Sequence, residues 1–184
     1  MRHVFMEAAA ERLTKLNIAT FRYNFPFMEA GRGGPNHAPI LVKTVRSAVT
    51  EAASLEPDLP LFAGGKSLGG RMTSTAASKQ PLPGVLGLAF FGFPLHAPGR
   101  DSDERGAHLA DVGLPMLFLQ GTRDRLARLG LLEPLLERVK PRPTLHVVES
   151  ADHGFHVIKK SGRTDEEVLD EMCSRFSTWI SELA

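Results

Sequence analysis

Gly65-Lys66-Ser67-Leu68-Gly69 is the stretch that decides how this chain is expected to fold, because it places a serine between two glycines directly after the apolar run Leu61-Phe62-Ala63. A strand that turns sharply into a helix needs small residues beside the turn, since side chains there would collide with the neighbouring strand and helix. The serine at the centre must accept a strained backbone, which exposes its hydroxyl beyond the sheet. The stretch therefore predicts a nucleophile elbow, with Ser67 as the candidate nucleophile.

Two later apolar runs are each followed by a residue that completes a known chemical pattern. Residues 117–120 run into Asp124, and residues 145–148 run into His153. A serine, an acid and a histidine thus follow in that order, each just past the carboxyl end of a predicted strand. Open α/β sheets bind ligands at that edge, and the order is the one found in α/β hydrolases.

The chemistry of a serine nucleophile assigns a role to each of these residues. Ser67 is a weak nucleophile until a base takes its proton, so we expect His153 within hydrogen-bonding reach and a carboxylate that fixes the tautomer of the ring. We expect Asp124 to be that carboxylate, although a helix cap is a competing role for it. Asp152 is the alternative, but adjacent side chains on a loop tend to point apart, and Asp152 does not follow the penultimate strand. The backbone N–H of Leu68 is expected to bind the oxyanion.

Four motifs carry a closer resemblance. The chain resembles a small dienelactone-hydrolase-like branch of the α/β hydrolases over nearly its whole length, in the segments Gly64-Gly65-Lys66-Ser67-Leu68-Gly69-Gly70-Arg71-Met72, Phe93-Pro94-Leu95-His96-Ala97-Pro98-Gly99, Leu119-Gln120-Gly121-Thr122-Arg123-Asp124 and Ala151-Asp152-His153. The resemblance implies an α/β-hydrolase fold, with a mostly parallel, doubly wound sheet. It also implies hydrolysis of an ester or related acyl bond through an acyl-enzyme on Ser67. This mechanism needs no metal and no organic cofactor.

The chain departs from the resembled family at its start. In that family a His-Gly-rich loop supplies a second oxyanion N–H just before the residues that match Met1 to Met6, and a further strand lies between those expected at Ile18 and Leu61. Three arrangements would account for the difference: a truncated product or a start placed too late, direct pairing of the flanking strands, or another chain in the gap. We favour the first.

The difference at the start also bears on function. Loss of one oxyanion donor typically lowers turnover about 10²–10³-fold. A noncatalytic scaffold or regulatory protein that keeps the fold is therefore the alternative function.

Apolar periodicity predicts the rest of the framework. Helices are expected around residues 6–17, 41–55, 69–79, 129–139 and 169–183, and strands around 18–24, 61–63, 84–91, 116–120 and 145–148. Residues 93–105 are expected to be irregular. Strands that alternate with helices throughout indicate a parallel sheet with right-handed crossovers, within one domain that covers residues 1–184.

Composition excludes several classes of function. A chain of 184 residues with 42% hydrophobic residues suits one core. The net charge of +1 and the scattered Lys and Arg residues give no field that would attract nucleic acid or an anionic membrane. Because no apolar stretch approaches the roughly eighteen residues needed to cross a bilayer, and no signal-peptide pattern opens the chain, we expect a cytoplasmic protein. Its expected partner is a small acyl substrate, and self-association into a homo-oligomer is left open.

Two other kinds of site are suggested and then disfavoured by spacing. Lys66-Ser67 is similar to the end of a phosphate-binding loop, but Pro60 stands where the first glycine of that loop would be. His153, His156 and Asp152 contain metal-ligating groups, but no further ligand falls at a suitable spacing. We therefore expect neither nucleotide binding nor metal binding, and we expect His156 to lie at the surface or at a pocket rim.

Three single residues keep two interpretations each. Arg71 could pair with a carboxylate on the substrate, or it could form a structural salt bridge on its helix. His96 is expected to shape the loop near the site, with a substrate contact as the alternative. The single cysteine, Cys173, lies in an amphipathic segment and is expected to pack in the core rather than to react.

Overall fold

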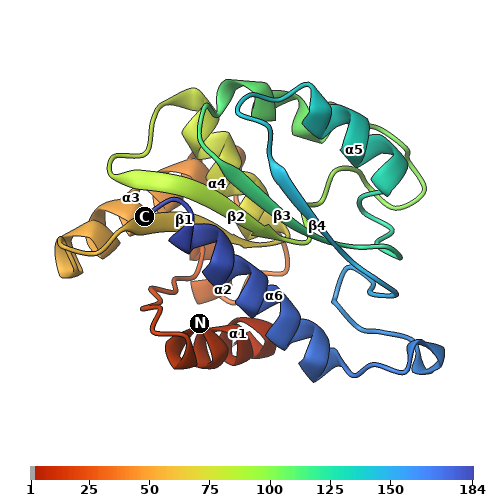
Figure 1. Ribbon diagram of the computed structural model, residues 1–184. Helices are drawn as coiled ribbons and strands as arrows, with labels where there is room; N and C mark the ends of the chain where they lie inside the picture. Colours follow the sequence, from red (N-terminus) through yellow and green to blue (C-terminus); the bar gives the residue numbers. More distant parts are fainter. Residues whose placement is uncertain (1–2) are drawn as a thin grey trace.

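A sheet of four parallel strands forms the centre of the computed structural model, which describes residues 3–184 (Figure 1). In sequence and spatial order the strands are β1 (Leu61–Lys66), β2 (Val85–Phe91), β3 (Met116–Gly121) and β4 (Thr144–Val148). The register pairs Lys66 with Phe91 and Gly121 with Val148. The carboxyl ends of all four strands therefore lie along one edge of the sheet.

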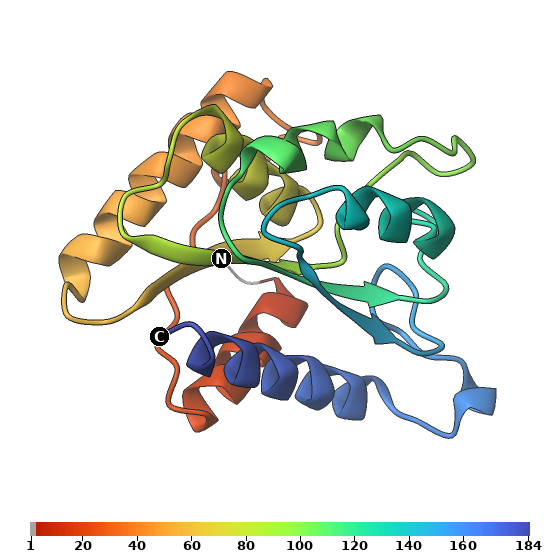
Figure 2. The same ribbon diagram turned by 45° about the horizontal axis from the view of Figure 1, so that its top comes forward.

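Helices cover both faces of the sheet, as Figures 1 and 2 show. One face carries α1 (Val4–Lys15) and α6 (Asp165–Ser181), and the other carries α3 (Ala38–Leu55), α4 (Leu68–Lys79), the 3₁₀ helix η1 (Glu104–Asp111) and α5 (Leu129–Glu137). Two shorter pieces are α2 (Pro26–Glu29) and η2 (Lys159–Ser161). No helix within residues 3–184 is long and apolar enough to span a bilayer. The helices and the parallel sheet that the sequence predicts are confirmed.

The apolar core has two halves because the sheet is covered on both faces. Leu88 and Phe90 of β2 belong to the half formed with α3, α4 and α5, whereas Ala89 and Phe91 belong to the half formed with α1 and α6. A strand buried on both sides needs apolar residues at every position rather than at alternate ones. This explains the continuous apolar run in β2.

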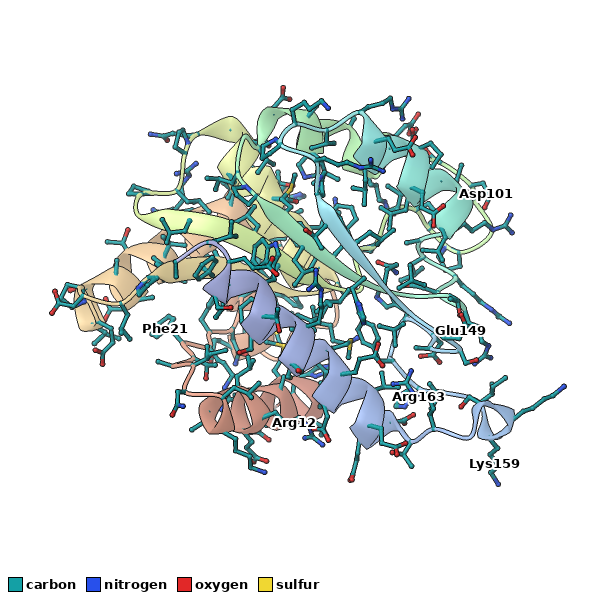
Figure 3. The ribbon with its side chains drawn as sticks, in the orientation of Figure 1. Arg12, Phe21, Asp101, Glu149, Lys159 and Arg163 are labelled. Atoms are coloured by element: carbon teal, nitrogen blue, oxygen red, sulfur yellow. The ribbon has the colours of Figure 1, made fainter. Side chains whose placement is uncertain are left out.

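The helices α1 and α6 are also joined by polar contacts. Arg12 on α1 lies against α6 (Figure 3), where its Nε donates to Asp170 at 2.5 Å. The N-terminus of α6 is closed by a capping box, in which Thr164 and Glu167 each accept a hydrogen bond from the other's backbone N–H. The ion pair joins the two helices, and the capping box satisfies backbone N–H groups at the start of α6.

The strand expected over residues 18–24 is not formed. These residues are extended, but within residues 3–184 no strand pairs with them, and β1 is the edge of the sheet. A strand needs a hydrogen-bonded neighbour about 4.8 Å away. A pocket of about 760 Å³ separates this segment from β1 instead.

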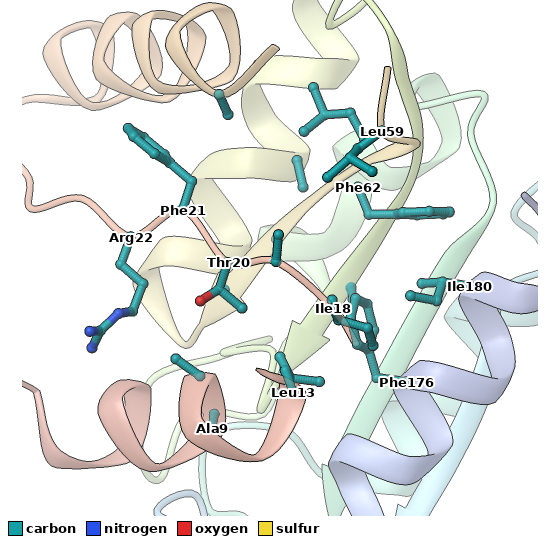
Figure 4. A pocket seen from close by; sticks show the side chains of 18 of the residues that line it. Ala9, Leu13, Ile18, Thr20, Phe21, Arg22, Leu59, Phe62, Phe176 and Ile180 are labelled. Atoms are coloured by element: carbon teal, nitrogen blue, oxygen red, sulfur yellow. The ribbon is translucent and has the colours of Figure 1, made fainter. Parts of the chain in front are cut away.

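Figure 4 shows the walls of this pocket. Its labelled side chains come from the extended segment (Ile18, Thr20, Phe21), from the approach to β1 and its beginning (Leu59, Phe62), and from the helices α1 and α6 (Leu13, Phe176, Ile180). Direct pairing of the two flanking segments, one of the three arrangements considered for the start of the chain, is therefore wrong. Apolar side chains of α1 and α6 line the pocket between the two segments.

Candidate active site

Ser67 occupies the sharp turn between β1 and α4. Its backbone has φ 51° and ψ −119°, a conformation that residues with a Cβ rarely adopt. Two hydrogen bonds hold it: its N–H donates to the carbonyl of Phe91 at 3.2 Å, and its carbonyl accepts from the N–H of Arg71 at 3.1 Å. The strained turn expected at this position is present.

Two glycines near the turn lie so close to neighbouring backbone atoms that a side chain would not fit, whereas a third has free space around it. A Cβ added to Gly64 would lie 1.9 Å from the carbonyl oxygen of Ala89, and one on Gly70 would lie 2.7 Å from the carbonyl oxygen of Gly65. A Cβ on Gly69 would meet nothing within 4 Å. The prediction that the glycines avoid collisions is therefore confirmed for Gly64 in β1 and for Gly70, where α4 contacts β1. It is wrong for Gly69.

Three residues that lie far apart in the sequence form a continuous line of hydrogen bonds. The Nε2 atom of His153, in the loop after β4, lies 2.8 Å from the Oγ atom of Ser67. Its Nδ1 atom lies 2.7 Å from the Oδ2 atom of Asp124, which follows β3. The side chain of Asp124 is fully buried, while that of His153 is about one-quarter exposed (24%). The hydroxyl, the imidazole and the carboxylate thus meet at the carboxyl edge of the sheet.

Two further donors compensate the burial of the Asp124 carboxylate. The Nε2 of Gln120 donates to Oδ2 at 2.5 Å, and the backbone N–H of Leu126 donates to Oδ1 at 2.7 Å. Gln120 is itself fixed, because its Oε1 accepts from the N–H of Phe93 at 2.9 Å. Without such partners a buried carboxylate would be costly. Gln120 was not identified from the sequence, where its signal is an amide at the end of an otherwise apolar strand.

Asp152, the alternative acid, serves its own loop. Its Oδ1 accepts hydrogen bonds from the backbone N–H groups of Gly154 at 2.8 Å and His156 at 3.0 Å. Among the described residues, Asp124 is the acid that bonds to the ring of His153.

Lys66 ties the elbow to the loop that carries the histidine. Its Nζ donates to the carbonyl oxygen of His153 at 2.8 Å and lies 4.6 Å and 4.9 Å from the ring centres of Phe5 and Phe155. Burial lowers the pKa of Lys66 to about 8, and the carboxylate of Asp124 partly offsets this effect. The sequence suggests only a phosphate-loop role for Lys66, because its partner lies 87 residues away in the chain.

The backbone N–H of Leu68 is a candidate donor to an oxyanion. Leu68 is the first residue of α4, so its N–H has no partner inside the helix. The segment expected to supply a second N–H precedes Met1, outside the residues that the structure describes.

The remaining candidates fall into structural roles. His96 is buried, and its Nε2 accepts from the N–H of Arg128 at 3.1 Å, so it shapes the loop as expected. His156 is exposed and bonds to Asp165 at 2.6 Å. Cys173 is buried, and burial raises the pKa of its thiol to about 11, as suits a packing residue. No group of three potential metal ligands occurs within residues 3–184.

Comparison with known proteins identifies the family. A family model described as an alpha/beta hydrolase domain matches residues 1–181, so the chain belongs to this family. This agrees with the fold class predicted from the sequence.

Solved structures resemble this chain over most of its length. An alpha-beta serine hydrolase homologue from Coxiella burnetii has a TM-score of 0.74 at 18% identity, over 95% of this chain and 76% of that one. A dienelactone hydrolase from Anabaena variabilis has a TM-score of 0.71 at 19% identity, over 99% and 80%. An esterase domain from Rhodothermus marinus has a TM-score of 0.68 at 15% identity, over 97% and 81%. At these identities the similarity shows a shared fold.

Proposed function

We propose that this protein is a serine hydrolase that cleaves an ester or related acyl bond through an acyl-enzyme on Ser67. The observation that supports the proposal most directly is the line of hydrogen bonds from the Oγ of Ser67 through both nitrogens of His153 to Asp124. Membership of the alpha/beta hydrolase family is consistent with it. The substrate in this proposal is a small acyl compound.

The first half of the reaction forms the acyl-enzyme. The Oγ of Ser67 attacks the acyl carbon while the Nε2 of His153 takes the hydroxyl proton. Asp124, bonded to Nδ1, keeps the proton on that nitrogen and stabilises the imidazolium that forms. The same imidazolium then protonates the leaving alcohol, and the bond between the acyl carbon and the leaving oxygen breaks.

The second half returns the enzyme to its starting state. His153 takes a proton from water, the resulting hydroxide attacks the acyl carbon, and Ser67 leaves with the proton from Nε2. In both halves the N–H of Leu68 donates to the oxygen that becomes negative. Where one donor acts in place of two, turnover is expected to be about 10²–10³-fold lower.

Active-site labelling tests the proposal. A fluorophosphonate probe reacts with a serine that a neighbouring base activates, so the native protein should be labelled, and Ser67→Ala should not be. A His153→Gln variant should be labelled far more slowly, because it lacks the base. Labelling of Ser67→Ala at the native rate would contradict the assignment of the nucleophile.

A noncatalytic scaffold is the second candidate function. It is favoured by the open pocket beside β1, because within residues 3–184 no strand pairs with the free edge of the sheet next to the elbow. The labelling experiment separates the two candidates if it is repeated on a protein with a strand and a loop fused ahead of Met1. The added strand would pair with β1, and the added loop would supply the second oxyanion N–H. Absence of labelling in both forms would favour the scaffold.

A further inference from the structure

The side-chain amide of Gln120 joins the core of the sheet to the candidate acid. Gln120 is the penultimate residue of β3 and is fully buried. Its Oε1 accepts a hydrogen bond from the backbone N–H of Phe93 at 2.9 Å, and its Nε2 donates to the Oδ2 of Asp124 at 2.5 Å. The amide therefore lies between the segment that follows β2 and the segment that follows β3.

The orientation of this amide is determined by its two neighbours. A backbone N–H can only donate and an ionised carboxylate can only accept, so the carbonyl oxygen must face Phe93 and the NH₂ group must face Asp124. A flipped amide would place two donors together at Phe93 and two acceptors together at Asp124. Gln120 thus serves both groups in a single orientation, which a side chain without one donor and one acceptor cannot do.

The Phe93 end of this connection is fixed by the aromatic core. The ring of Phe93 is fully buried, and its centre lies 5.5 Å from that of Phe90 in β2 and 5.5 Å from that of Phe118 in β3. Interiors packed in this way leave side chains and the adjoining backbone little freedom. The N–H of Phe93 is therefore a fixed reference point for the amide.

The carboxylate end belongs to a loop. Asp124 lies within residues 122–128, which are outside any helix or strand, and rotation of a carboxylate about its χ2 angle is soft. Its Oδ2 must nevertheless face the Nδ1 of His153, which lies 2.7 Å away. Among the described residues three groups hydrogen-bond to this carboxylate: the amide of Gln120, the N–H of Leu126 and the ring of His153. Of these three, only Gln120 lies in a strand of the sheet.

We propose that Gln120 is a positioning residue of the active site, whose amide anchors the carboxylate of Asp124 to the core and thereby keeps the ring of His153 directed at Ser67. This inference rests on the proposed function. Because Oδ2 accepts from both Gln120 and His153, a displaced carboxylate would also lose its bond to the imidazole. The imidazole would then lose its fixed tautomer and orientation. Since Gln120 is fully buried, it acts through Asp124 and not on the substrate.

Hydrolysis of 4-nitrophenyl acetate by Gln120→Met measures the loss of the anchor. Met keeps the length of the side chain but cannot donate to Asp124, so kcat should fall about tenfold, as is typical of one hydrogen bond to a charged group. KM should stay within about twofold, because Gln120 does not touch the substrate. A kcat equal to that of the native protein would overturn the proposal.

Ser74→Ala is the matched control. Ser74 is also fully buried, and its Oγ lies 2.8 Å from the Nε2 of His108 on η1. The variant removes a buried polar contact that does not involve Asp124, so it should leave kcat unchanged. Urea denaturation midpoints of both variants control for folding.

A double-mutant cycle separates positioning from a general structural role. If Gln120 acts only through Asp124, adding Gln120→Met to Asp124→Asn should change the rate of fluorophosphonate labelling by less than about twofold. A further loss of about tenfold would show two independent effects and would overturn the proposal.

Gln120→Glu is a second variant that keeps the acceptor for the N–H of Phe93. Its carboxyl group can donate to Asp124 only while it holds a proton. Its labelling rate should therefore exceed that of Gln120→Met, and increasingly so as the pH falls from about 8 to about 6. A rate that stays as low as that of Gln120→Met at every pH would contradict the donor role.

Failure of this inference can be told from failure of the proposed function. If a fluorophosphonate labels Ser67 but Gln120→Met reacts at the native rate, the positioning role is wrong and the hydrolase proposal stands. If no labelling occurs, proton NMR tests the anchor alone, because a proton shared between the Nδ1 of His153 and a carboxylate gives a low-field signal without any turnover. That signal, assigned by its loss in His153→Gln, should weaken or disappear in Gln120→Met. A signal that Gln120→Met leaves unchanged would overturn the inference.

Discussion

The Nζ atom of Lys66 lies 2.8 Å from the carbonyl oxygen of His153, so the residue before the proposed nucleophile holds the loop that carries the proposed base. The contact joins the end of β1 to the loop after β4, across the whole width of the sheet at its carboxyl edge. Its ammonium group also lies against two aromatic rings. A charged hydrogen bond between these elements gives the imidazole a fixed position relative to Ser67.

Lys66→Met should slow labelling of Ser67 by a fluorophosphonate about tenfold, because it removes the charged donor but keeps the length of the side chain. Lys66→Arg should restore much of the rate, since it keeps a cation beside the two rings. Circular dichroism of each variant controls for folding. Equal labelling rates in the native protein and in Lys66→Met would show that the contact does not position His153.

The pKa of Lys66 near 8 predicts a loss of labelling rate on the alkaline side. Above that pH the amine becomes neutral, and its hydrogen bond to the carbonyl of His153 weakens. The rate in the native protein should therefore fall as the pH rises through about 8. In Lys66→Arg the fall should move to higher pH, because arginine does not titrate in this range. A pH profile that is the same in both proteins would contradict this origin.

The same pKa makes a prediction for stability. The folded value is lowered from 10.5 to about 8, so between these limits the unfolded chain binds more protons than the folded one. The free energy of unfolding should rise with pH across that interval through this group, and the contribution is lost as the pH falls through about 8. Urea titrations of the native protein and of Lys66→Met at pH 7 and pH 9.5 would measure it. A difference between the two proteins that does not change with pH would count against the lowered pKa.

Asp124→Asn and Asp152→Asn form a matched pair of variants. Asp124→Asn should lower turnover by about 10⁴, because an asparagine amide favours the wrong tautomer of the histidine. Asp152→Asn should have a much smaller effect, since Asp152 accepts from backbone N–H groups of its own loop rather than from the imidazole. Hydrolysis of 4-nitrophenyl acetate by both variants would test this. Comparable losses in the two would contradict the proposed role of Asp124.

Gly64→Ala should destabilise the protein by at least about 3 kcal/mol, because the new methyl group would overlap a backbone carbonyl that cannot move away within the sheet. Gly69→Ala is the control. It adds the same methyl group in the first turn of α4, where nothing lies within 4 Å, and it should be neutral or slightly stabilising. Urea denaturation midpoints measure both. A larger loss in Gly69→Ala than in Gly64→Ala would contradict the packing described for the elbow.

Much of the fold could be predicted from local patterns. The strands around residues 61, 85, 116 and 144, and the helices between them, follow from apolar periodicity and lie close to their expected positions. Residues 18–24 have an equally strand-like sequence, yet they form no strand because pairing depends on a neighbour that local sequence does not provide. The 3₁₀ helix η1 was also missed, since its eight residues are fewer than the window over which a period can be recognised.

The surroundings of the candidate site were harder to predict than its principal residues. Gln120 and Lys66 were missed because their partners, Asp124 and His153, are brought to them by different loops. The structural salt bridge considered for Arg71 is wrong, because none of the ion pairs within residues 3–184 includes Arg71. Its Nε is buried without a hydrogen-bond partner among these residues.

The sequence by itself determined the order of strands and helices, the turn that carries Ser67, and the three residue types that follow β1, β3 and β4. These features are local, because periodicity and glycine spacing act over a few residues. Only the tertiary structure decided which acid bonds to His153, that no acid within residues 3–184 pairs with Arg71, and that a pocket lies beside β1. Such contacts join residues from distant parts of the chain, and their geometry is set by how the two helical layers pack against the sheet.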